Sequence, residues 1–404
     1  MSTLKVSNIR HNSATSDAIT MASDGTCTAK ITSVGGGHLS HRNIIVNGAM
    51  MVAQRSTSST NNGYGSVDRF QCQHSGADEN PTHSQHTLTS SDTGPWEEGF
   101  RKSFHVQNGN NTNGAGAGDW MRIWHKIEAQ DMANSGWNYT SPSSYITLSF
   151  WVKVSVAKTY YVQMRTSDGT SKNYYFTMNL SADTWTKVTH SIPGHADISF
   201  DNDNGEGIYI AWYGYRGTNN TGSGQNANQW YDFVGATITP DQTPDWWTTN
   251  DATFEITGVQ LEVGDVATSY EHLRFGEELS RCQRYYYQVG GQTNDGQPDE
   301  PYGVLLPMAM NATATRVKGV LTHPVPMRTG PSVSGGGSGA CLCQCGDVSS
   351  STVLVFQAIW TASNTARHTW VDMSPNSGTV GLTGETGVVY ANNSTYHFKV
   401  TAEF

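Results

Sequence analysis

The feature that most constrains the fold is a period-two alternation of apolar and polar residues, in short runs separated by turn residues. The clearest run covers residues 145–153, and others cover 160–165, 174–179, 185–190 and 208–215. Such alternation places successive side chains on opposite faces of a β-sheet. Many short strands at this spacing predict an all-β protein built on a jelly-roll β-sandwich.

The composition agrees with short strands and excludes two classes of partner. Only 14% of the 404 residues are charged, whereas 42 are Gly and 10% are aromatic. The net charge is -10 and no basic block is present, so we expect no nucleic-acid partner. No run approaches the roughly 18 apolar residues of a membrane span, and residues 1–22 lack a secretory pattern. We therefore expect neither membrane insertion nor a signal peptide.

Changes in pattern divide the chain into four segments. Residues 1–42 form a small N-terminal unit followed by a Gly-rich joint, and residues 43–275 form the predicted jelly roll. Residues 276–288 have the spacing of a helix, with acidic residues in the first turn, and predict a short helical neck. Residues 289–404 return to alternating runs and predict a C-terminal β-sandwich tip.

Several stretches resemble tail-fibre and virion appendage proteins of tailed phages, notably marine phages. Residues 42–50, followed by Gln54-Arg55 and Val67-Asp68-Arg69, are similar to the opening of their jelly-roll domain. Residues 256–264 and 267–272 resemble its closing strand and exit, and residues 282–286 follow as in that family. Weaker similarities are Pro326-Met327-Arg328 and Ala402-Glu403. The jelly roll itself is similar to carbohydrate-binding modules.

The resemblance implies a structural protein on the phage particle that is not an enzyme and needs no cofactor. It would form a homotrimer, because fibres present identical tips around an axis. Residues 1–34 are too small for a core of their own and would attach to another virion protein. The chain would then contact a host-surface glycan or another envelope component. We expect the tip to be distal, although the competing arrangement places the jelly roll outermost.

Two other functions remain open from the sequence. One is a structural appendage without receptor binding, such as a neck or collar fibre or a capsid decoration protein. The other is a polysaccharide depolymerase, which needs a pair of carboxylic acids. The spacing selects no pair among the candidate carboxylates, which are Glu98, Glu128, Asp131 and Glu206.

Glycan binding needs flat aromatic faces together with amides and carboxylates for the hydroxyl groups. Alternation in residues 208–215 puts three tyrosines on the face opposite Trp212, and two more aromatic residues follow a polar loop. This set predicts a sugar platform; a trimer contact or the second wall of the sandwich is the alternative. Its members are Tyr209, Tyr213, Tyr215, Trp230 and Tyr231.

The helical neck carries an apolar stripe that needs a partner surface. We expect the stripe to lie near a three-fold axis; the alternative is that it packs onto its own jelly roll. Its members are Leu279, Cys282, Tyr285 and Tyr286.

Two further groups could bind a metal. Residues 201–206 resemble a calcium loop without the complete twelve-residue pattern, so Asp201, Asp203 and Glu206 are weak candidates, and a simple turn is the alternative. Cys341, Cys343 and Cys345 alternate and would share one strand face. They are either buried thiols or, on a symmetry axis, a metal or disulfide site.

Overall fold

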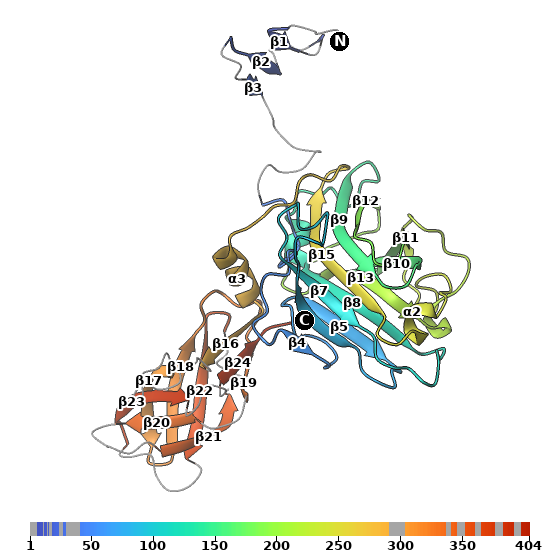
Figure 1. Cartoon of the computed structure of the whole chain (residues 1–404). Coiled ribbons are helices and arrows are strands. Elements are labelled where there is room, and N and C mark those ends of the chain that lie inside the picture. Colours follow the sequence, from blue (N-terminus) through green and yellow to red (C-terminus); the bar gives the residue numbers. More distant parts are fainter. Residues whose placement is uncertain are drawn as a thin grey trace.

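The computed structural model describes residues 6–10, 12–13, 15, 18–23, 27–29, 41–290, 304–336, 341–345, 352–359, 365–375, 383–391 and 397–404. Over these residues the chain is built almost entirely from antiparallel β-strands, as predicted, and Figure 1 shows a large sandwich joined to a smaller barrel. No helix in the described part is both long and apolar enough to cross a membrane.

The N-terminal unit is a sheet of three short strands, β1 (Asn8–Ile9), β2 (Ile19–Met21) and β3 (Cys27–Ala29). None of its described side chains is buried, and Ile9 is 49% exposed. A sheet of this size gains almost nothing from burial of its own apolar surface.

The sandwich consists of two antiparallel sheets. The first has the order β14-β11-β10-β13-β8-β5, and the second has the order β12-β9-β15-β7-β6-β4. The chain crosses repeatedly between the sheets, which is the winding of a jelly roll, and all five runs predicted as strands are strands. The first sheet contains β5 (Phe70–Ser75), β8 (Trp120–Glu128), β10 (Lys158–Thr166), β11 (Lys172–Leu180), β13 (Glu206–Arg216) and β14 (Tyr231–Asp232). The second contains β4 (Ser58–Ser59), β6 (Thr82–Thr87), β7 (Lys102–Gln107), β9 (Tyr145–Val154), β12 (Thr186–Pro193) and β15 (Thr253–Val263).

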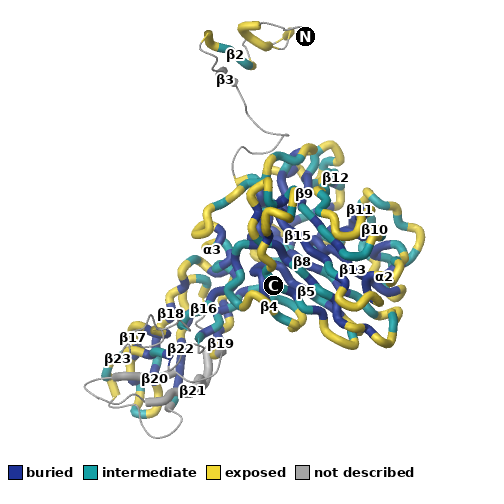
Figure 2. Tube along the Cα trace, viewed as in Figure 1, coloured by how far each residue is buried: buried dark blue, intermediate teal, exposed yellow. Residues whose placement is uncertain are grey.

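The main core lies between the inner faces of these two sheets. Phe70 and Trp212 of the first sheet meet Phe104, Phe150 and Phe254 of the second, and all five are buried. Figure 2 shows this buried density along the strands, with exposed residues concentrated in the connections. Three short helices interrupt the strands: α1 (Ala129–Ala133), η1 (Thr218–Asn220) and α2 (Asp245–Thr248).

The opening and closing stretches that carry the phage resemblance pack directly against each other. The Ile44 N–H donates to the Leu261 carbonyl (2.9 Å), and the Val259 N–H donates to the Gly48 carbonyl (3.0 Å). A Cβ at residue 48 would lie 2.0 Å from the Val259 carbonyl oxygen, so only Gly fits. Asn47 adopts φ 62°, and its side chain bonds to Val52 and Asp68. These stretches are therefore structural.

The predicted helical neck is shorter than expected and packs on its own chain. Helix α3 spans Phe275–Gln283, and β16 (Tyr286–Gly290) begins inside the predicted neck. Cys282 and Tyr285 are buried in a cluster with Val46 and Val52 of the sandwich, and Leu279 packs on its edge. Burial raises the pKa of the Cys282 thiol well above its usual value. The stripe therefore meets its own sandwich, which was the alternative, and provides no free seam at a three-fold axis.

The C-terminal tip is a closed barrel, where the sequence predicted a sandwich. The barrel order is β17-β18-β22-β21-β20-β23, and a second sheet, β16-β24-β19, joins it to the sandwich. Pairing of β17 with β23 closes the sheet on itself and removes its exposed edges. The positions of the strands in the sequence do not indicate this pairing. The strands are β17 (Val304–Thr313), β18 (Arg316–Thr322), β19 (Ser332–Gly336), β20 (Cys341–Cys345), β21 (Thr352–Ile359), β22 (His368–Pro375), β23 (Thr386–Ala391) and β24 (His397–Thr401).

The three clustered cysteines lie on β20, as the alternation predicted, but their side chains fall outside the described residues. Trp370 of β22 is 45% exposed on the outside of the barrel. It pairs across the strands with Val320, which is also exposed.

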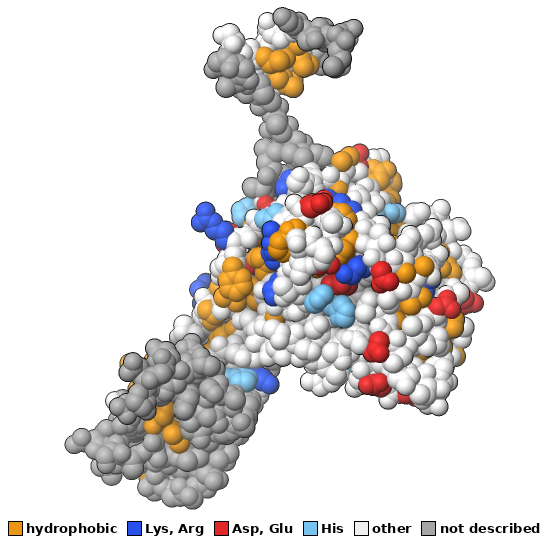
Figure 3. Space-filling model, viewed as in Figure 1, with side chains coloured by type: hydrophobic (Ala, Val, Ile, Leu, Met, Phe, Trp, Pro, Cys, Tyr) orange, Lys and Arg blue, Asp and Glu red, His pale blue; other side chains and the backbone are white. Residues whose placement is uncertain are grey.

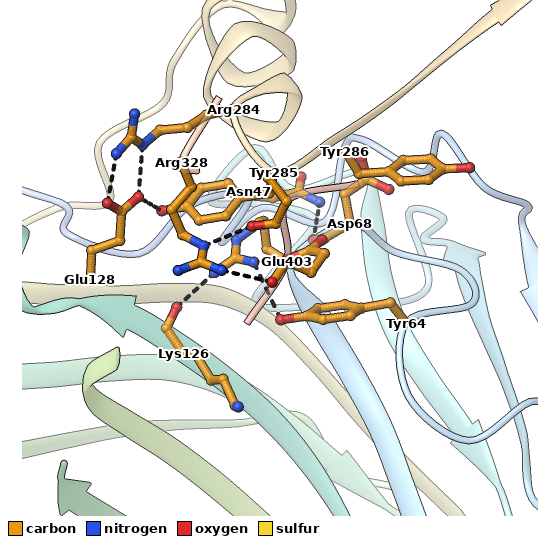
Figure 4. A network of polar contacts seen from close by, with 12 residues as sticks. Asn47, Tyr64, Asp68, Lys126, Glu128, Arg284, Tyr285, Tyr286, Arg328 and Glu403 are labelled. Carbon is orange, nitrogen blue, oxygen red and sulfur yellow. Dashed lines mark hydrogen bonds and ion pairs between the residues drawn. The ribbon is translucent and has the colours of Figure 1, made fainter. Parts of the chain in front are cut away.

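A dense polar network joins the sandwich to the barrel (Figure 4). Glu403, which follows β24, accepts hydrogen bonds from Arg69 and from Arg55, the latter at 3.1 Å. The Arg69 guanidinium lies 3.5 Å from the centroid of the Tyr285 ring. Burial alone would lower the pKa of Arg69, but the neighbouring Glu403 carboxylate raises it above its usual range.

Arg328 ties the same junction from the barrel side. Its guanidinium donates to the carbonyl groups of Ala402 (2.7 Å), Glu403 (2.8 Å) and Asn204 (2.7 Å). Glu128 of the sandwich accepts two bonds from Arg284, at 2.6 and 2.7 Å, and one from the Tyr285 hydroxyl at 2.6 Å. We call this set of contacts the junction network. Several stretches that resemble phage appendages contribute to it, through Arg55, Arg69, Tyr285, Arg328 and Glu403.

Candidate carbohydrate-binding face

The predicted tyrosine platform is buried and cannot serve as an open sugar-binding surface. Tyr209 and Tyr213 point to the outer side of the first sheet, but both belong to a closed cluster with Tyr161 and Tyr175. The loop after β13 covers this cluster, and the Tyr175 hydroxyl donates to the Gln225 carbonyl at 2.9 Å. Burial raises the pKa of Tyr209. The cluster is therefore a second, small core.

Tyr215 lies on the opposite side of the sheet from Tyr213, contrary to the alternation. The register of β13 against β8 shifts between Tyr213 and Tyr215, so Gly214 forms a bulge there. The extra residue reverses the alternation, and Tyr215 enters the main core, where its ring is 5.7 Å from that of Trp247. A strict period of two could not reveal this reversal.

The other two members of the predicted platform are half-buried and lie apart. Trp230 packs against the main core, and its indole N–H donates to the Pro193 carbonyl at 2.7 Å. Tyr231 packs against the tyrosine cluster and donates to the Ile238 carbonyl. The five residues therefore do not form one face.

The candidate calcium ligands do not converge either. Asp203 accepts from the Gly205 N–H, whereas Glu206 forms an ion pair with Lys126 at 2.8 Å and accepts from Ser167. In the part of the chain that the structure describes, no three His, Cys, Asp or Glu side chains are grouped so that they could hold a metal ion. The loop is a turn, the alternative weighed above, and Asn204 within it contacts Arg328.

The candidate catalytic carboxylates are engaged with cations. Glu128 and Glu206 occupy paired positions on neighbouring strands, yet Glu128 is held by Arg284 and Glu206 by Lys126. Glu98 lies beside the outer face of the second sheet, where it forms an ion pair with Lys187 of β12. Burial and the nearby Glu128 raise the pKa of Asp131.

A different set of side chains lies on the same outer face beside the tyrosine cluster, against which one of its members, Trp124, packs. Successive outward positions of β8 carry Trp120, Arg122, Trp124 and Lys126, and all four are partly exposed. We call these four residues the β8 row. The inward positions Met121, Ile123 and Ile127 lie in the main core and fix the orientation of the row. The signal in the sequence for this row is the pattern Trp-x-Arg-x-Trp-x-Lys, which was not among the predicted sites.

Cations and indoles contact one another along the row. The Arg122 guanidinium carbon lies 3.8 Å from the Trp124 ring centroid and 5.0 Å from that of Trp120. The Lys126 ammonium lies 4.2 Å from the Trp124 ring. Each contact of this kind contributes about 0.5–1 kcal/mol at an exposed site. Trp124 therefore anchors both cations, whereas Trp120 has only the longer contact with Arg122.

Polar and aromatic side chains of neighbouring strands extend the row on both sides. On β5, Gln73 accepts from Arg122 Nε (3.2 Å) and Nη2 (2.7 Å), and it donates to Gln71. Beyond β13, Arg165 of β10 lies 3.6 Å from the Phe233 ring and donates to Ser171. The face thus offers indole surface next to amides and guanidinium groups, which is the chemistry that sugar recognition requires.

The outer face of the second sheet is arranged differently. Trp151 and Trp185 lie there, outside the main core, and their indole N–H groups donate to Glu98 (3.0 Å) and Asp92 (3.0 Å). Those acids pair in turn with lysines. In Figure 3, the visible face of the molecule mixes acidic, basic and histidine side chains among small hydrophobic patches.

Comparison with known proteins gives distant structural likenesses. No protein family and no curated protein matches the sequence. The enzymatically active domain of bacteriophage CBA120 tailspike protein 4 is 12% identical with a TM-score of 0.29, over 55% of this chain and 21% of that chain. A putative sugar binding protein from Bacteroides thetaiotaomicron is 13% identical with a TM-score of 0.29, over 55% and 99%. A xylan-binding domain from Paenibacillus barcinonensis is 8% identical with a TM-score of 0.26, over 58% and 100%.

Proposed function

We propose that this chain is a binding protein of a phage particle that attaches to host-surface glycans through the β8 row and is not an enzyme. One observation carries the glycan part: two partly exposed indoles alternate with two cations on a rigid strand, beside an amide side chain. Loops and exposed strand faces on a rigid sandwich are common places for binding residues. The resemblance of the junction stretches to phage appendage proteins supports the location on a virion.

The indole of Trp120 is the candidate stacking surface. Burying one aromatic face against a sugar ring contributes roughly 1.5 kcal/mol, which corresponds to about a tenfold change in affinity. A partly exposed polar side chain such as Gln73 would then orient the hydroxyl groups. Single sugar contacts of this kind are weak, and several copies on one particle would raise the avidity.

The direct test is a glycan array probed with the purified full-length chain, followed by titration of the best ligand. Trp120→Ala should weaken binding about tenfold without changing the unfolding midpoint. The matched control is Trp96→Ala, because Trp96 also carries a stacked arginine, Arg101 at 3.7 Å, but on the other sheet's side. Equal loss of binding in both variants, or in neither, would contradict the assignment to this face.

A structural appendage without receptor binding remains the second candidate, favoured by the number of buried contacts in the junction network. Adsorption separates the two candidates. Excess purified protein should block adsorption of the phage to its host if the chain binds the receptor, and should have no effect if it only builds the particle. Release of reducing ends from host polysaccharide would instead identify a depolymerase.

We also propose that the chain is a homotrimer and that residues 1–34 attach it to another virion protein. Sedimentation should then give three chains of 43.9 kDa each. Deletion of residues 1–34 should leave a folded trimer that no longer enters particles. Normal incorporation of the shortened chain would refute the anchor, and a monomer would refute the trimer.

A further inference from the structure

We infer that the β8 row selects acidic glycans, meaning polymers whose sugars carry carboxylate or phosphate groups. This inference rests on the proposed function, because it names the ligand class of the same face. It follows from the charges that surround the row and from the donors that the row leaves unused.

The charge balance of this face differs from that of the whole chain. The chain has a net charge of -10, yet the outward side chains of β8 and β10 include Arg122, Lys126 and Arg165. Lys126 is neutralised by Glu206 at 2.8 Å. Within the described residues, Arg122 and Arg165 form no ion pair with a carboxylate. Two guanidinium groups therefore remain without a counter-charge on one face of an acidic protein.

The geometry of Arg122 suits an anion. Its Nε and Nη2 both donate to the single Gln73 oxygen, at 3.2 and 2.7 Å, and its plane is held against Trp124. No hydrogen bond from Nη1 to any described residue is present. Stacking leaves the edge of a guanidinium group open, and that edge matches the two oxygens of a carboxylate or phosphate. Because Trp124 and Gln73 already fix the side chain, little rotational freedom is lost on binding.

A second donor on the row is also unsatisfied. The indole N–H of Trp124 is buried and has no hydrogen-bond partner among the described residues. A buried donor without an acceptor is unfavourable. The burial of this N–H puts it out of reach of a ligand, so anion binding on the row depends on Arg122.

The contrast with the second sheet supports the same reading. There, the cations Lys153 and Lys187 are paired with Asp92 and Glu98, and those acids also accept the indole N–H groups. Those two lysines, two acids and two indole donors are therefore satisfied within the face. The β8 row has indoles and cations as well, but the carboxylates are missing at Arg122 and Arg165. A ligand that carries the carboxylates completes the arrangement.

The test compares glycans that differ only in charge. Polygalacturonate and its fully methyl-esterified form share one backbone, and an array of phosphorylated and neutral microbial glycans covers the other acidic class. We expect the full-length chain to bind at least one acidic class at least ten times more tightly than its neutral counterpart. The preference should weaken several-fold when the salt concentration rises from 20 to 150 mM. The Debye length shortens as salt is added, so the attraction between the guanidinium groups and the anionic glycan is screened more strongly.

Variants assign the preference to the row. Arg122→Gln should remove most of the preference, so that the acidic and neutral partners bind this variant with affinities within about twofold of each other. Arg101→Gln is the matched control, since Arg101 also stacks on a tryptophan but lies beside the other sheet, and it should change neither. Both variants should unfold at the temperature of the unmodified chain.

The outcomes separate this inference from the function on which it rests. Binding of neutral glycans as tightly as acidic ones, or an acidic preference that survives Arg122→Gln, overturns the inference and leaves glycan binding intact. Absence of binding to every glycan overturns both. Selective binding of phosphorylated glycans over uronic acids, or the reverse, supports the inference and identifies the anion.

Discussion

Replacing Glu403 by Gln tests whether the junction network holds the barrel to the sandwich. The substitution preserves volume, so no cavity forms, but it removes the carboxylate that faces Arg69 and Arg55. The side chains of Arg69 and Glu403 are only 1% and 8% exposed. Removing one partner of a buried ion pair costs about 3–5 kcal/mol, because the remaining charge is left uncompensated.

The lower end of that range applies here. Arg69 keeps hydrogen bonds to the Tyr64 hydroxyl (3.3 Å) and the Lys126 carbonyl (2.8 Å), and its ring contact with Tyr285 is unchanged. A loss of about 3 kcal/mol lowers the unfolding midpoint of a domain of 150–250 residues by roughly 6–12 °C. Scanning calorimetry of the full chain measures this shift directly.

Two further variants make the result interpretable. Glu97→Gln removes an exposed carboxylate in the sandwich and should change stability by less than about 0.5 kcal/mol. A double variant, Arg69→Met with Glu403→Gln, removes both charges and should recover part of the loss. If Glu403→Gln unfolds at the same temperature as Glu97→Gln, the network does not stabilise the junction and the reasoning is refuted.

Three other substitutions address separate features. Gly48→Ala should lower the free energy of unfolding by about 1–3 kcal/mol, because the added Cβ meets the Val259 carbonyl. Gly276→Ala in α3 has open space around it and should be neutral or stabilising. Equal unfolding midpoints for the two variants would contradict this. Burial lowers the pKa of His323 to about 4 from an ordinary value near 6.5. Between these pH values the imidazole binds a proton in the unfolded chain but not in the folded barrel. The stability of the barrel should therefore fall as the pH drops through this window. His323→Gln should flatten that dependence in thermal scans from pH 7 to pH 4. Leu306→Ala inside the barrel should cost about 2–5 kcal/mol, whereas Trp370→Ser, at a 45% exposed site, should cost far less; the reverse order in denaturant titrations would mean that Trp370 is a core residue.

The strands of the sandwich could be predicted because burial of one face imposes a period of two. The same rule failed at Tyr215, since one bulged residue at Gly214 reverses the alternation without any change in composition. For Tyr209 and Tyr213 the rule gave the correct side of the sheet. The prediction that they are exposed was wrong, because a loop covers them. Alternation reports which side of a sheet a residue occupies and does not report what covers that side.

The junction could not be predicted for a different reason. Arg69 and Glu403 are separated by 334 positions, and nothing local in either stretch indicates the other. Closure of the barrel through β17 and β23 depends on a similar long-range pairing. The β8 row, by contrast, was readable as a local pattern, and an outward alternation of Trp with Arg and Lys is a signal worth seeking in other all-β chains.

The separation between the junction network and the β8 row has an evolutionary consequence. Of the row's side chains, only that of Lys126 comes near the junction, where its ammonium lies 5.8 Å from the Phe404 ring. Trp120, Arg122 and Gln73 can therefore mutate without changing how the barrel is held. Under the proposed function, a lineage that meets altered surface polymers would change its target by a few substitutions on one strand, while every descendant keeps the same joint between sandwich and barrel.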